Sequence, residues 1–283
     1  MIGITGANGH LGRLVIEQLL AQIPAAQIVA VVRSPEKAAD LAGKGVQVRF
    51  GDYNEPQSLD AAFAGLSKLL FISSSDVGRR GPQHKAVIEA AKRSGVQLVA
   101  YTSLLHADTS PLPLAAEHRE TEVMLKESGL PHVLLRNGWY TENYLGSLSA
   151  VLEHGVMYGC AGNGKVSSAS RADYARAATV VLTNDGHAGK TYELGGDHSF
   201  TLAEFASEVA RQSRLPVRYQ NLPEDEFQAV LVKAGLPAFL ATLIAESETG
   251  ASKGGLFDDS KDLSKLTGHP TTPLATMVDA SLA

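Results

Sequence analysis

Three glycines near the start of the chain have a spacing that suggests phosphate binding. Gly6, Gly9 and Gly12 stand three residues apart in ITGANGHLG, between an apolar run and a segment with helical periodicity. Such a loop exposes backbone N–H groups at the start of a helix, where the helix dipole also attracts anions. We expect Gly6 to permit a tight turn, Gly9 to let a pyrophosphate approach, and Gly12 to let the helix lie close to the sheet. The pattern predicts a dinucleotide-binding loop, and the alternative is a chance grouping of glycines.

A single arginine indicates which dinucleotide this loop would bind. Arg33 lies 21 residues after Gly12, where the second apolar run ends. A carboxylate there would accept hydrogen bonds from a ribose 2′-hydroxyl, whereas a guanidinium can form a fork onto a 2′-phosphate and stack on adenine. We therefore predict a preference for NADP(H) over NAD(H). The alternative is a solvated surface arginine.

Hydroxyl side chains gather at the ends of two later apolar runs. Ser73, Ser74 and Ser75 end the run that begins KLLFI, and Thr102 lies near the end of VQLVAYTS. Ligands of parallel sheets bind beyond the carboxyl ends of the strands, so these hydroxyls are expected to line the ribose and diphosphate region of the cofactor site. Hydroxyl-rich loops are common there, and a structural role is the alternative.

The catalytic residues of conventional short-chain dehydrogenases are missing from the sequence. Those enzymes use a serine and a Tyr-x-x-x-Lys pair, in which the lysine lowers the pKa of the proton-donating tyrosine. Ser103 lies where that serine is expected, but none of the eight tyrosines has a lysine four residues later. No G-x-S-x-G motif and no His/Cys cluster is present, so no metal site is predicted. His84 and His118 are isolated and are predicted to lie on the surface.

A quinone acceptor would make that absence tolerable. A quinone is strongly electrophilic, and its product oxyanion is a stabilised phenolate that water or weak donors can protonate. Positioning the two rings then supplies most of the catalysis. His106 follows the run that ends at Ser103 and is a candidate to polarise an oxygen. A structural hydrogen bond from a loop histidine is the alternative.

Polar and flat side chains are combined in the stretch RNGWYTENY. Asn137, Tyr140 and Asn143 supply amide and hydroxyl groups, and Trp139 offers a surface for a nicotinamide or quinone ring. Tyr140 and Asn143 are therefore predicted to take part in the site. For Trp139 and Tyr144, packing inside the protein is the alternative.

Strands and helices that alternate along the first half of the chain would place these residues at one sheet edge. Six apolar runs alternate with helical segments, at 1–5, 27–32, 46–50, 68–73, 96–103 and 132–137. QIVAVV is apolar on both faces, as a strand of a buried parallel sheet is. The predicted fold is α/β, a Rossmann-like doubly wound parallel sheet with right-handed crossovers.

The alternation becomes less regular after about residue 140. We expect one NAD(P)-binding Rossmann-like domain over 1–283, with a core of about 1–153. A small integrated C-terminal α/β lobe on the substrate side would be built mainly from 154–283. In this part Thr201 is expected to cap a helix, and two further helices are expected to break at Gly235 and Pro237.

The composition argues against several classes of partner. The chain has 283 residues, 44% of them hydrophobic, and a formal net charge of -5 without a basic block, so nucleic acid is not expected. No apolar run approaches the roughly 20 residues of a membrane span, and no signal peptide is recognisable. The one cysteine, Cys160, is expected to be a small buried hydrophobe, and a cytoplasmic protein is predicted. The sequence leaves a homodimer open.

Longer stretches of the chain are similar to a known family. ITGANGHLG, VVRSPEKA, LLFISSSDVGRRGPQHKAVIEAAKRSGV, AYTSLLHADTSPL, LLRNGWYTENY and GLFDDSKDLSKLTGHPTT together resemble the NmrA-like, atypical short-chain dehydrogenases, in particular the bacterial type 2 NAD(P)H:quinone oxidoreductases. The G-x-x-G-x-x-G spacing is also similar to that of extended and atypical members. The resemblance implies an oxidoreductase that uses NADPH to reduce a quinone or similar small electrophile, without flavin or metal.

The resemblance also implies positions for the site residues, from Gly6 to Leu11, at Arg33, from Ser73 to Ser75 and from Asn137 to Asn143. The predicted cofactor set is Gly6, Asn8, Gly9, His10, Leu11, Gly12, Arg33, Ser73, Ser74, Ser75, Thr102, Asn137, Gly138, Trp139, Tyr140 and Asn143. The predicted catalytic set is Tyr140, Asn143 and His106.

Two alternatives of different kinds remain open. NmrA-like proteins can be regulators that sense NADP and bind a protein partner without turnover, and residues 221–257 would then be the expected contact. The acceptor could also be another electrophile, such as an aldehyde or an enone. The missing Tyr-x-x-x-Lys pair argues against simple ketones but not against activated alkenes.

Overall fold

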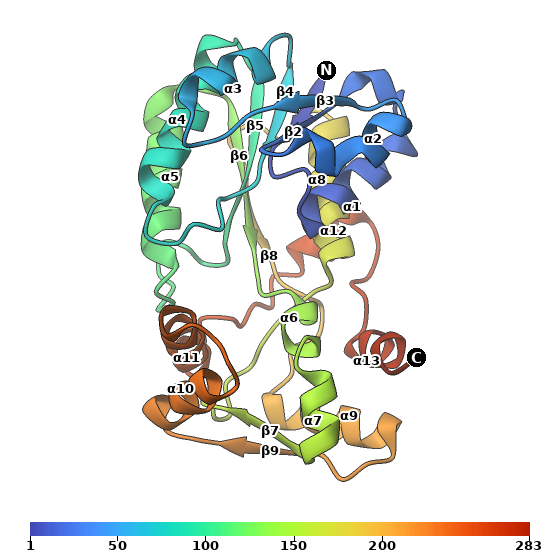
Figure 1. Ribbon diagram of the computed structural model, residues 1–283, viewed down its shortest axis with the longest axis vertical. Coiled ribbons are helices and arrows are strands. Elements are labelled where there is room, and N and C mark those ends of the chain that lie inside the picture. The colour runs from blue at the N-terminus through green and yellow to red at the C-terminus, as the bar shows by residue number, and fades with distance from the viewer. The chain divides into compact units, whose positions relative to one another are not determined.

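A seven-stranded sheet with strands from residues 2–194 is the largest sheet of the computed structural model, which describes residues 1–283 (Figure 1). The strand order is β3-β2-β1-β4-β5-β6-β8. The strands are β1 (Ile2–Ile4), β2 (Ile28–Val32), β3 (Gln47–Phe50), β4 (Lys68–Phe71), β5 (Leu98–Leu104), β6 (His132–Asn137) and β8 (Thr191–Leu194). From β1 the order runs to β3 on one side and through β4 on the other, so the predicted doubly wound sheet is confirmed.

Continuous apolar runs explain why these strands are central. Every residue of β2 and of β5 is buried, as both faces of a helix-covered parallel sheet require. β1 pairs in parallel with both neighbours, with Ile2 opposite Ile28 on one side and Lys68 on the other. One cluster of buried side chains joins the sheet to its helices and includes Phe63 and Phe71.

Helices cover both faces of this sheet. They are α1 (His10–Leu20), α2 (Ala39–Gly43), α3 (Pro56–Phe63), α4 (Arg80–Arg93), α5 (Ala115–Ser128) and α8 (Arg171–Thr183). In Figure 1, α4 and α5 lie on one side of the sheet, and α1 and α8 lie together on the other. The Gln18 amide of α1 donates to the carbonyl of Ala172 at 3.1 Å, which ties the start of α8 to α1.

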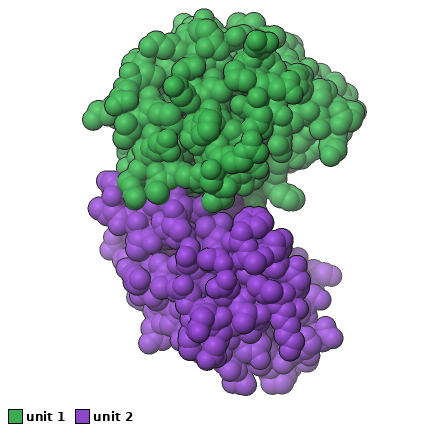
Figure 2. Space-filling view, turned by 60° about the vertical axis from the view of Figure 1, so that its left-hand side comes forward, with its two compact units in different colours: residues 1–104, 116–137, 171–192 green, residues 105–115, 138–170, 193–283 purple.

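The chain divides into two compact units that are interleaved in the sequence (Figure 2). Unit 1 contains 1–104, 116–137 and 171–192, and unit 2 contains 105–115, 138–170 and 193–283. Each unit therefore receives several separate segments. The predicted division into a core of about 1–153 and a lobe from 154–283 stays a prediction.

Unit 2 contains a two-stranded parallel sheet and mostly short helices. Its elements are α6 (Thr141–Leu145), α7 (Leu148–His154), β7 (Val156–Gly159), α9 (Leu202–Ser213), β9 (Arg218–Asn221), α10 (Glu224–Lys233), α11 (Ala238–Ser252), α12 (Asp262–Thr267) and α13 (Leu274–Leu282). Thr201 caps α9 in a capping box with Glu204, as its predicted role requires. None of the helices is long and apolar enough to cross a bilayer.

Candidate functional site

The predicted glycine loop joins β1 to α1 with a geometry that needs glycine. Gly6 has a φ of 58°, in the left-handed region, and the N–H of Gly9 donates to its carbonyl at 2.9 Å. A Cβ atom on Gly12 would lie 2.6 Å from the Gly6 carbonyl oxygen and 2.8 Å from Cα of Ala7. Only a residue without a side chain lets α1 pack this close to the loop.

A groove of about 450 Å³ lies beyond the carboxyl ends of β1 to β4, entirely within unit 1. Its lining residues are Gly6, Ala7, Asn8, Gly9, Val31, Val32, Arg33, Ser34, Lys37, Gly51, Asp52, Tyr53, Asn54, Ile72, Ser73, Ser74, Ser75 and Gln83. Seven residues of the predicted cofactor set are among them: Gly6, Asn8, Gly9, Arg33, Ser73, Ser74 and Ser75. His10, Leu11 and Gly12 lie in the first turn of α1 beside this lining, and Leu11 is buried.

Two cations beyond the end of β2 line the groove without neutralising partners. Arg33 and Lys37 are exposed, and no hydrogen bond or ion pair engages either side-chain head group. The nearby carboxylate of Asp40 is held by Arg13 at 2.6 Å, and this contact lowers the pKa of Asp40. Because Arg13 occupies that carboxylate, the two cations remain available to an anion.

Asn8 holds two walls of the groove together. Its Nδ2 donates to the Ser34 carbonyl at 3.2 Å, and its Oδ1 accepts from Arg13 at 3.2 Å. Arg13 also donates to the carbonyl of Lys37 at 2.8 Å. The glycine loop and the segment after β2 are therefore joined by side chains of α1 and its preceding loop.

The loop that contains Ser73, Ser74 and Ser75 after β4, here called the serine loop, is held by residues outside the groove. Thr102 is buried in β5, and its Oγ1 accepts from the N–H of Ser73 at 2.9 Å. The N–H of Ser74 donates to Nε2 of His84 at 2.9 Å, and Arg80 donates to the Ser74 carbonyl at 2.7 Å. Thr102, a member of the predicted cofactor set, thus holds the backbone of the serine loop and is not among the residues that line the groove.

The prediction that His84 and His118 lie on the surface was wrong. His84 is fully buried, and His118 is 5% exposed. Burial, with a smaller effect of the Arg80 charge, lowers the pKa of each imidazole to about 3. Both rings are therefore neutral at pH 7, and each is hydrogen-bonded inside unit 1.

The groove wall after β3 was not predicted from the sequence. Gly51, Asp52, Tyr53 and Asn54 follow that strand and line the groove. The Tyr53 hydroxyl donates within hydrogen-bond distance of two oxygens, Oγ1 of Thr5 at 2.6 Å and the carbonyl of Ile72 at 2.9 Å, and burial raises its pKa. The rule that predicted the serine loop, polar residues at the carboxyl end of a strand, would also have found this wall.

The stretch RNGWYTENY leads from β6 in unit 1 into unit 2. Asn137 is buried at the end of β6, whereas Trp139 and Tyr140 are half-buried and Asn143 is exposed. The backbone around Trp139 and Tyr140 pairs with Ala169, whose N–H donates to the Trp139 carbonyl at 3.2 Å. These bonds place Tyr140 at the N-cap of α6, with Asn143 inside that helix.

Gly138 and Tyr144 of this stretch contact other residues of unit 2. The N–H of Gly138 donates to the Leu194 carbonyl at 3.0 Å. The ring of Tyr144 packs against Phe200 and Phe205, with centroid distances of 6.1 Å and 5.9 Å. For Tyr144 the packing alternative is therefore the one observed, and burial raises the pKa of its phenol.

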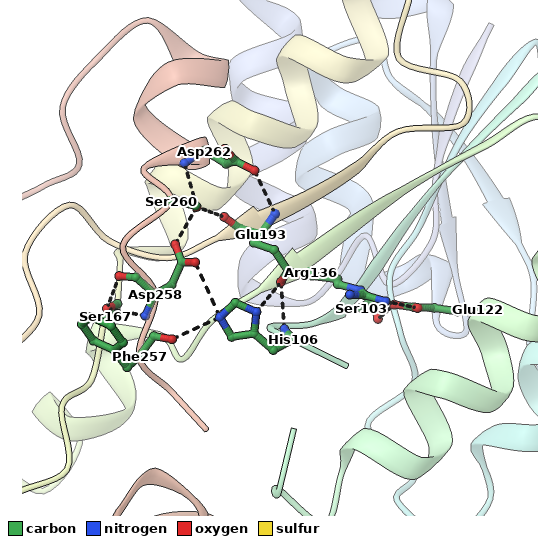
Figure 3. A network of polar contacts seen from close by, with 10 residues as sticks. All are labelled: Ser103, His106, Glu122, Arg136, Ser167, Glu193, Phe257, Asp258, Ser260 and Asp262. Carbon is green, nitrogen blue, oxygen red and sulfur yellow. Dashed lines mark hydrogen bonds and ion pairs between the residues drawn. The ribbon is translucent and has the colours of Figure 1, made fainter. Parts of the chain in front are cut away.

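His106 has oxygen neighbours on both ring nitrogens (Figure 3). Its Nδ1 lies 3.5 Å from Glu193, and its Nε2 lies 3.5 Å from Asp258 and 3.1 Å from the Phe257 carbonyl. The backbone N–H of His106 also donates to Glu193 at 2.8 Å, and its φ of 51° is unusual for a residue with a side chain. All of these residues belong to unit 2, and they fit the structural alternative for His106.

Ser103 is hydrogen-bonded to an ion pair of unit 1, the one between Glu122 and Arg136 (Figure 3). Its hydroxyl donates to Glu122 at 2.5 Å, and Arg136 donates to both oxygens of the same carboxylate at 3.0 Å and 2.7 Å. The residue in the place of the usual catalytic serine therefore binds a carboxylate. This contact agrees with the missing Tyr-x-x-x-Lys pair.

Cys160 is the small buried residue that the sequence predicted. It is 9% exposed, its thiol donates to the Ala245 carbonyl at 3.2 Å, and burial raises its pKa to about 11. Its backbone N–H donates to Glu248 at 2.6 Å. Burial raises the pKa of that carboxyl to about 7.

Comparison with known proteins gives matches along nearly the whole chain. The model of a family described as NAD(P)H-binding matches residues 6–185. Quinone oxidoreductase 2 of Escherichia coli (strain K12) is 60% identical over 278 residues, which cover 98% of this chain and 97% of that protein. An NAD(P)H azoreductase of Xenophilus azovorans is 30% identical over 285 residues, which cover 100% of this chain and 98% of the azoreductase.

Solved structures agree with the fold. The crystal structure of the NADPH-dependent quinone oxidoreductase QOR2 from Escherichia coli, complexed with NADPH, superposes with a TM-score of 0.98 at 59% identity and full coverage of both chains. The triphenylmethane reductase of Citrobacter sp., complexed with NADP(H), gives a TM-score of 0.96 at 42% identity, covering 99% of this chain and 100% of that one. The predicted Rossmann-like fold is confirmed by both.

Proposed function

The chain belongs to the NAD(P)H-binding, NmrA-like family, and on that premise we propose that it is an NADPH-dependent quinone oxidoreductase that transfers hydride directly to its acceptor. The family predicted from the sequence is thereby confirmed. The observation that carries the proposal is the groove of unit 1, in which a glycine loop and two unpaired cations lie at the carboxyl ends of four strands. That arrangement fits a phosphorylated dinucleotide.

The residues present fit NADPH at its phosphate end. Gly9 has no side chain and is exposed, so the backbone just before α1 is accessible to a ligand, while Gly12 lets α1 pack close to the loop. The diphosphate would lie against Gly6–Gly9, and the 2′-phosphate would bind Arg33 and Lys37. When bound, NADPH supplies the hydride.

For the reacting end we propose the segment that runs from Asn137 to Asn143. Asn137 would bind the carboxamide side of the cofactor, and Trp139 would offer a flat surface. Tyr140 and Asn143 would donate hydrogen bonds to the oxygen of the acceptor that gains charge. These groups need not be strong acids, because the reduced quinone is a stabilised phenolate.

The role of His106 is a separate proposal. Its ring contacts carboxylates of Glu193 and Asp258 and the Phe257 carbonyl, which supports a structural function in holding the 105–115 segment. Direct polarisation of the acceptor by His106 stays a prediction. Substitution of His106 by Gln would keep a hydrogen-bonding group, and a kcat unchanged in this variant would contradict a direct role.

The test of the proposed function uses flavin-free protein. Purified protein with no flavin absorbance is mixed with NADPH and a soluble benzoquinone, and oxidation of the nicotinamide is followed. We expect oxidation well above the protein-free control, and much slower oxidation of NADH. A rate no faster than that control would contradict the proposal.

A wider acceptor range is the second candidate. An azoreductase and a triphenylmethane reductase are among the similar proteins, and their names describe conjugated electrophiles other than quinones. The ratio kcat/KM for a quinone, an azo dye and a triphenylmethane dye would rank these acceptors. Tight NADPH binding without turnover of any acceptor would instead support the NADP-sensing regulator.

We also propose a cytoplasmic location. The only cysteine is buried and hydrogen-bonded, and no disulfide stabilises the chain, which suits a reducing compartment. A homodimer stays a prediction, and sedimentation analysis would test it.

A further inference from the structure

The start of α4 carries a buried polar face. Arg80, Gln83 and His84 are 7%, 4% and 0% exposed, although α4 is a helix of the sheet-covering layer. Their spacing of three and four residues puts them on one side of the helix. Each of these three side chains forms a hydrogen bond with a loop that lines the groove.

The first contact is to both backbone polar groups of one groove residue. Nε2 of His84 accepts from the N–H of Ser74 at 2.9 Å, and Nε of Arg80 donates to the carbonyl of Ser74 at 2.7 Å. The peptide groups on either side of Ser74 are therefore held in place. This fixes where the chain presents the side chains of Ser73 and Ser75, which line the groove with Ser74.

The second contact joins the serine loop to the wall after β3. Nε2 of Gln83 donates to Oδ1 of Asn54 at 3.1 Å and to Oδ2 of Asp76 at 2.9 Å. Because Asp76 presents an acceptor, the amide nitrogen of Gln83 must face it. The polar face of α4, defined as Arg80, Gln83 and His84, thus contacts both loops.

The tautomer of His84 follows from its partners. Since Nε2 accepts from a backbone N–H, Nδ1 carries the hydrogen and donates to Oγ1 of Thr121 at 2.7 Å. Thr121 in turn donates to the Glu117 carbonyl at 2.8 Å. His84 is thus neutral and anchored to α5, with its acceptor nitrogen directed at the serine loop.

Arg80 is anchored in the same way. Its Nη1 donates to Nε2 of His118 at 3.2 Å, and Nδ1 of His118 lies 2.8 Å from the Tyr101 hydroxyl of β5. The loop is therefore connected through two chains of hydrogen bonds to rigid elements of the sheet and of α5. Such connected networks restrict the orientation of every member.

This network is an expensive way to fill space beneath a loop. A buried guanidinium and two buried imidazoles lose their hydration, and Oε1 of Gln83 is buried without a hydrogen-bond partner. Apolar side chains of similar volume would avoid these costs. What they could not do is hold the backbone of Ser74 at two points.

We propose that His84 and Arg80 are positioning residues for the cofactor: they hold Ser74 so that the serine loop presents its hydroxyls to bound NADPH. The proposal rests on the proposed function, since it assumes that the groove binds NADPH. It adds a reason for the polar face of α4. His84 thus affects the affinity for NADPH by holding the serine loop, and it makes no contact with the acceptor.

The test measures the dissociation constant of NADPH by calorimetric titration of folded protein. His84→Leu removes the acceptor for the Ser74 N–H, and we expect the constant to rise about tenfold, because the hydrogen bond to the loop is lost and the Ser74 N–H is left unpaired. At saturating NADPH, kcat should change less than about threefold. His84→Gln, whose amide oxygen can accept the same N–H, should stay within about threefold of the parent protein.

A matched control separates positioning from general stability. His187, in the segment before β8, is also a buried histidine, 9% exposed, and bonds the Tyr192 hydroxyl of β8 at 2.8 Å. The N–H of Gly189 in that segment donates to the carbonyl of His132, the first residue of β6. The segment therefore lies at the amino end of this strand, whereas the groove lies at the carboxyl ends of β1 to β4. His187→Leu should lower the melting temperature and leave the NADPH dissociation constant unchanged.

A further variant keeps the test decisive if His84→Leu does not fold. Arg80→Lys keeps the buried charge but removes the Nε donor to Ser74, and it should raise the same constant several-fold. An unchanged constant in the folded variants, or an equal rise in His187→Leu, would overturn the positioning role. Failure of the parent protein to bind NADPH would instead overturn the proposed function.

Discussion

The two units use their polar residues differently. In unit 1 seven of the predicted cofactor residues line one groove of about 450 Å³, and the cations of that groove have no partners. In unit 2 the cavity that touches α6, at Thr141, holds about 10 Å³, and His106 is already surrounded by oxygens. A polar residue with unsatisfied bonding capacity at a sheet edge indicates ligand binding, whereas a polar residue with several partners indicates structure.

The largest expected effect tests whether unit 1 alone determines cofactor binding. Gly12→Ala should raise the NADPH dissociation constant roughly 100-fold, because a Cβ 2.6 Å from the Gly6 carbonyl oxygen must push α1 away from the loop, at about 1–3 kcal/mol. Gly43→Ala is the matched control, since nothing lies within 4 Å of its Cβ position. Titration of both variants checks the prediction, and equal constants would contradict it.

The next effect tests the unpaired cation. Arg33→Ala should weaken NADPH by roughly 30-fold, or about 2 kcal/mol, and should change NADH less than twofold, because only NADPH carries the 2′-phosphate. The two dissociation constants are measured on one preparation. Equal losses for both cofactors would remove the assignment of Arg33 to the phosphate.

A smaller effect is expected in unit 2. Tyr140→Phe removes a hydroxyl while keeping the ring, and we expect kcat with benzoquinone to fall about tenfold, the equivalent of one hydrogen bond to the developing oxyanion. The NADPH dissociation constant should be unchanged. A loss of cofactor affinity with kcat intact would show that Tyr140 belongs to the cofactor site.

The last prediction concerns the stability of unit 2 rather than cofactor binding or turnover. Glu248 has a pKa of about 7 in the folded protein, raised by burial from its ordinary value, so the folded state holds a proton that the unfolded state releases at lower pH. The contribution of Glu248 to stability therefore falls as the pH rises from the ordinary carboxyl pKa to about 7.

Glu248→Gln removes this titration. Relative to the parent protein, the variant should gain about 3 kcal/mol in free energy of unfolding between about pH 4 and about pH 8. Denaturant unfolding at the two pH values measures the gain. A difference that does not depend on pH would show that the carboxyl of Glu248 titrates normally.

Much of unit 1 could be predicted because its signals are local. The strands are continuous apolar runs, and the positions of Gly6, Arg33 and Ser73 follow from one rule about the carboxyl ends of parallel strands. The same rule, applied after β3, would also have identified Tyr53. The loops of the groove were therefore within reach of the sequence.

The buried histidines of α4 and α5 could not be predicted from the sequence. His84 and His118 have polar side chains, and sequence patterns assign such residues to the surface unless their partners are known. Those partners, Ser74 and Tyr101, come from other elements, so only the folded structure brings them together. The same applies to His106, whose neighbours are 87 and 151 residues away along the chain.

The pairing of α8 with α1 has a consequence for any attempt to shorten the protein. α8 begins at Arg171, beyond the end of the predicted core, yet it packs on α1, the helix that follows the glycine loop. A fragment that stops at residue 153 would leave one apolar flank of that helix bare to water. Such a truncated chain should aggregate during expression, even though it would keep every glycine of the Gly6–Gly12 motif.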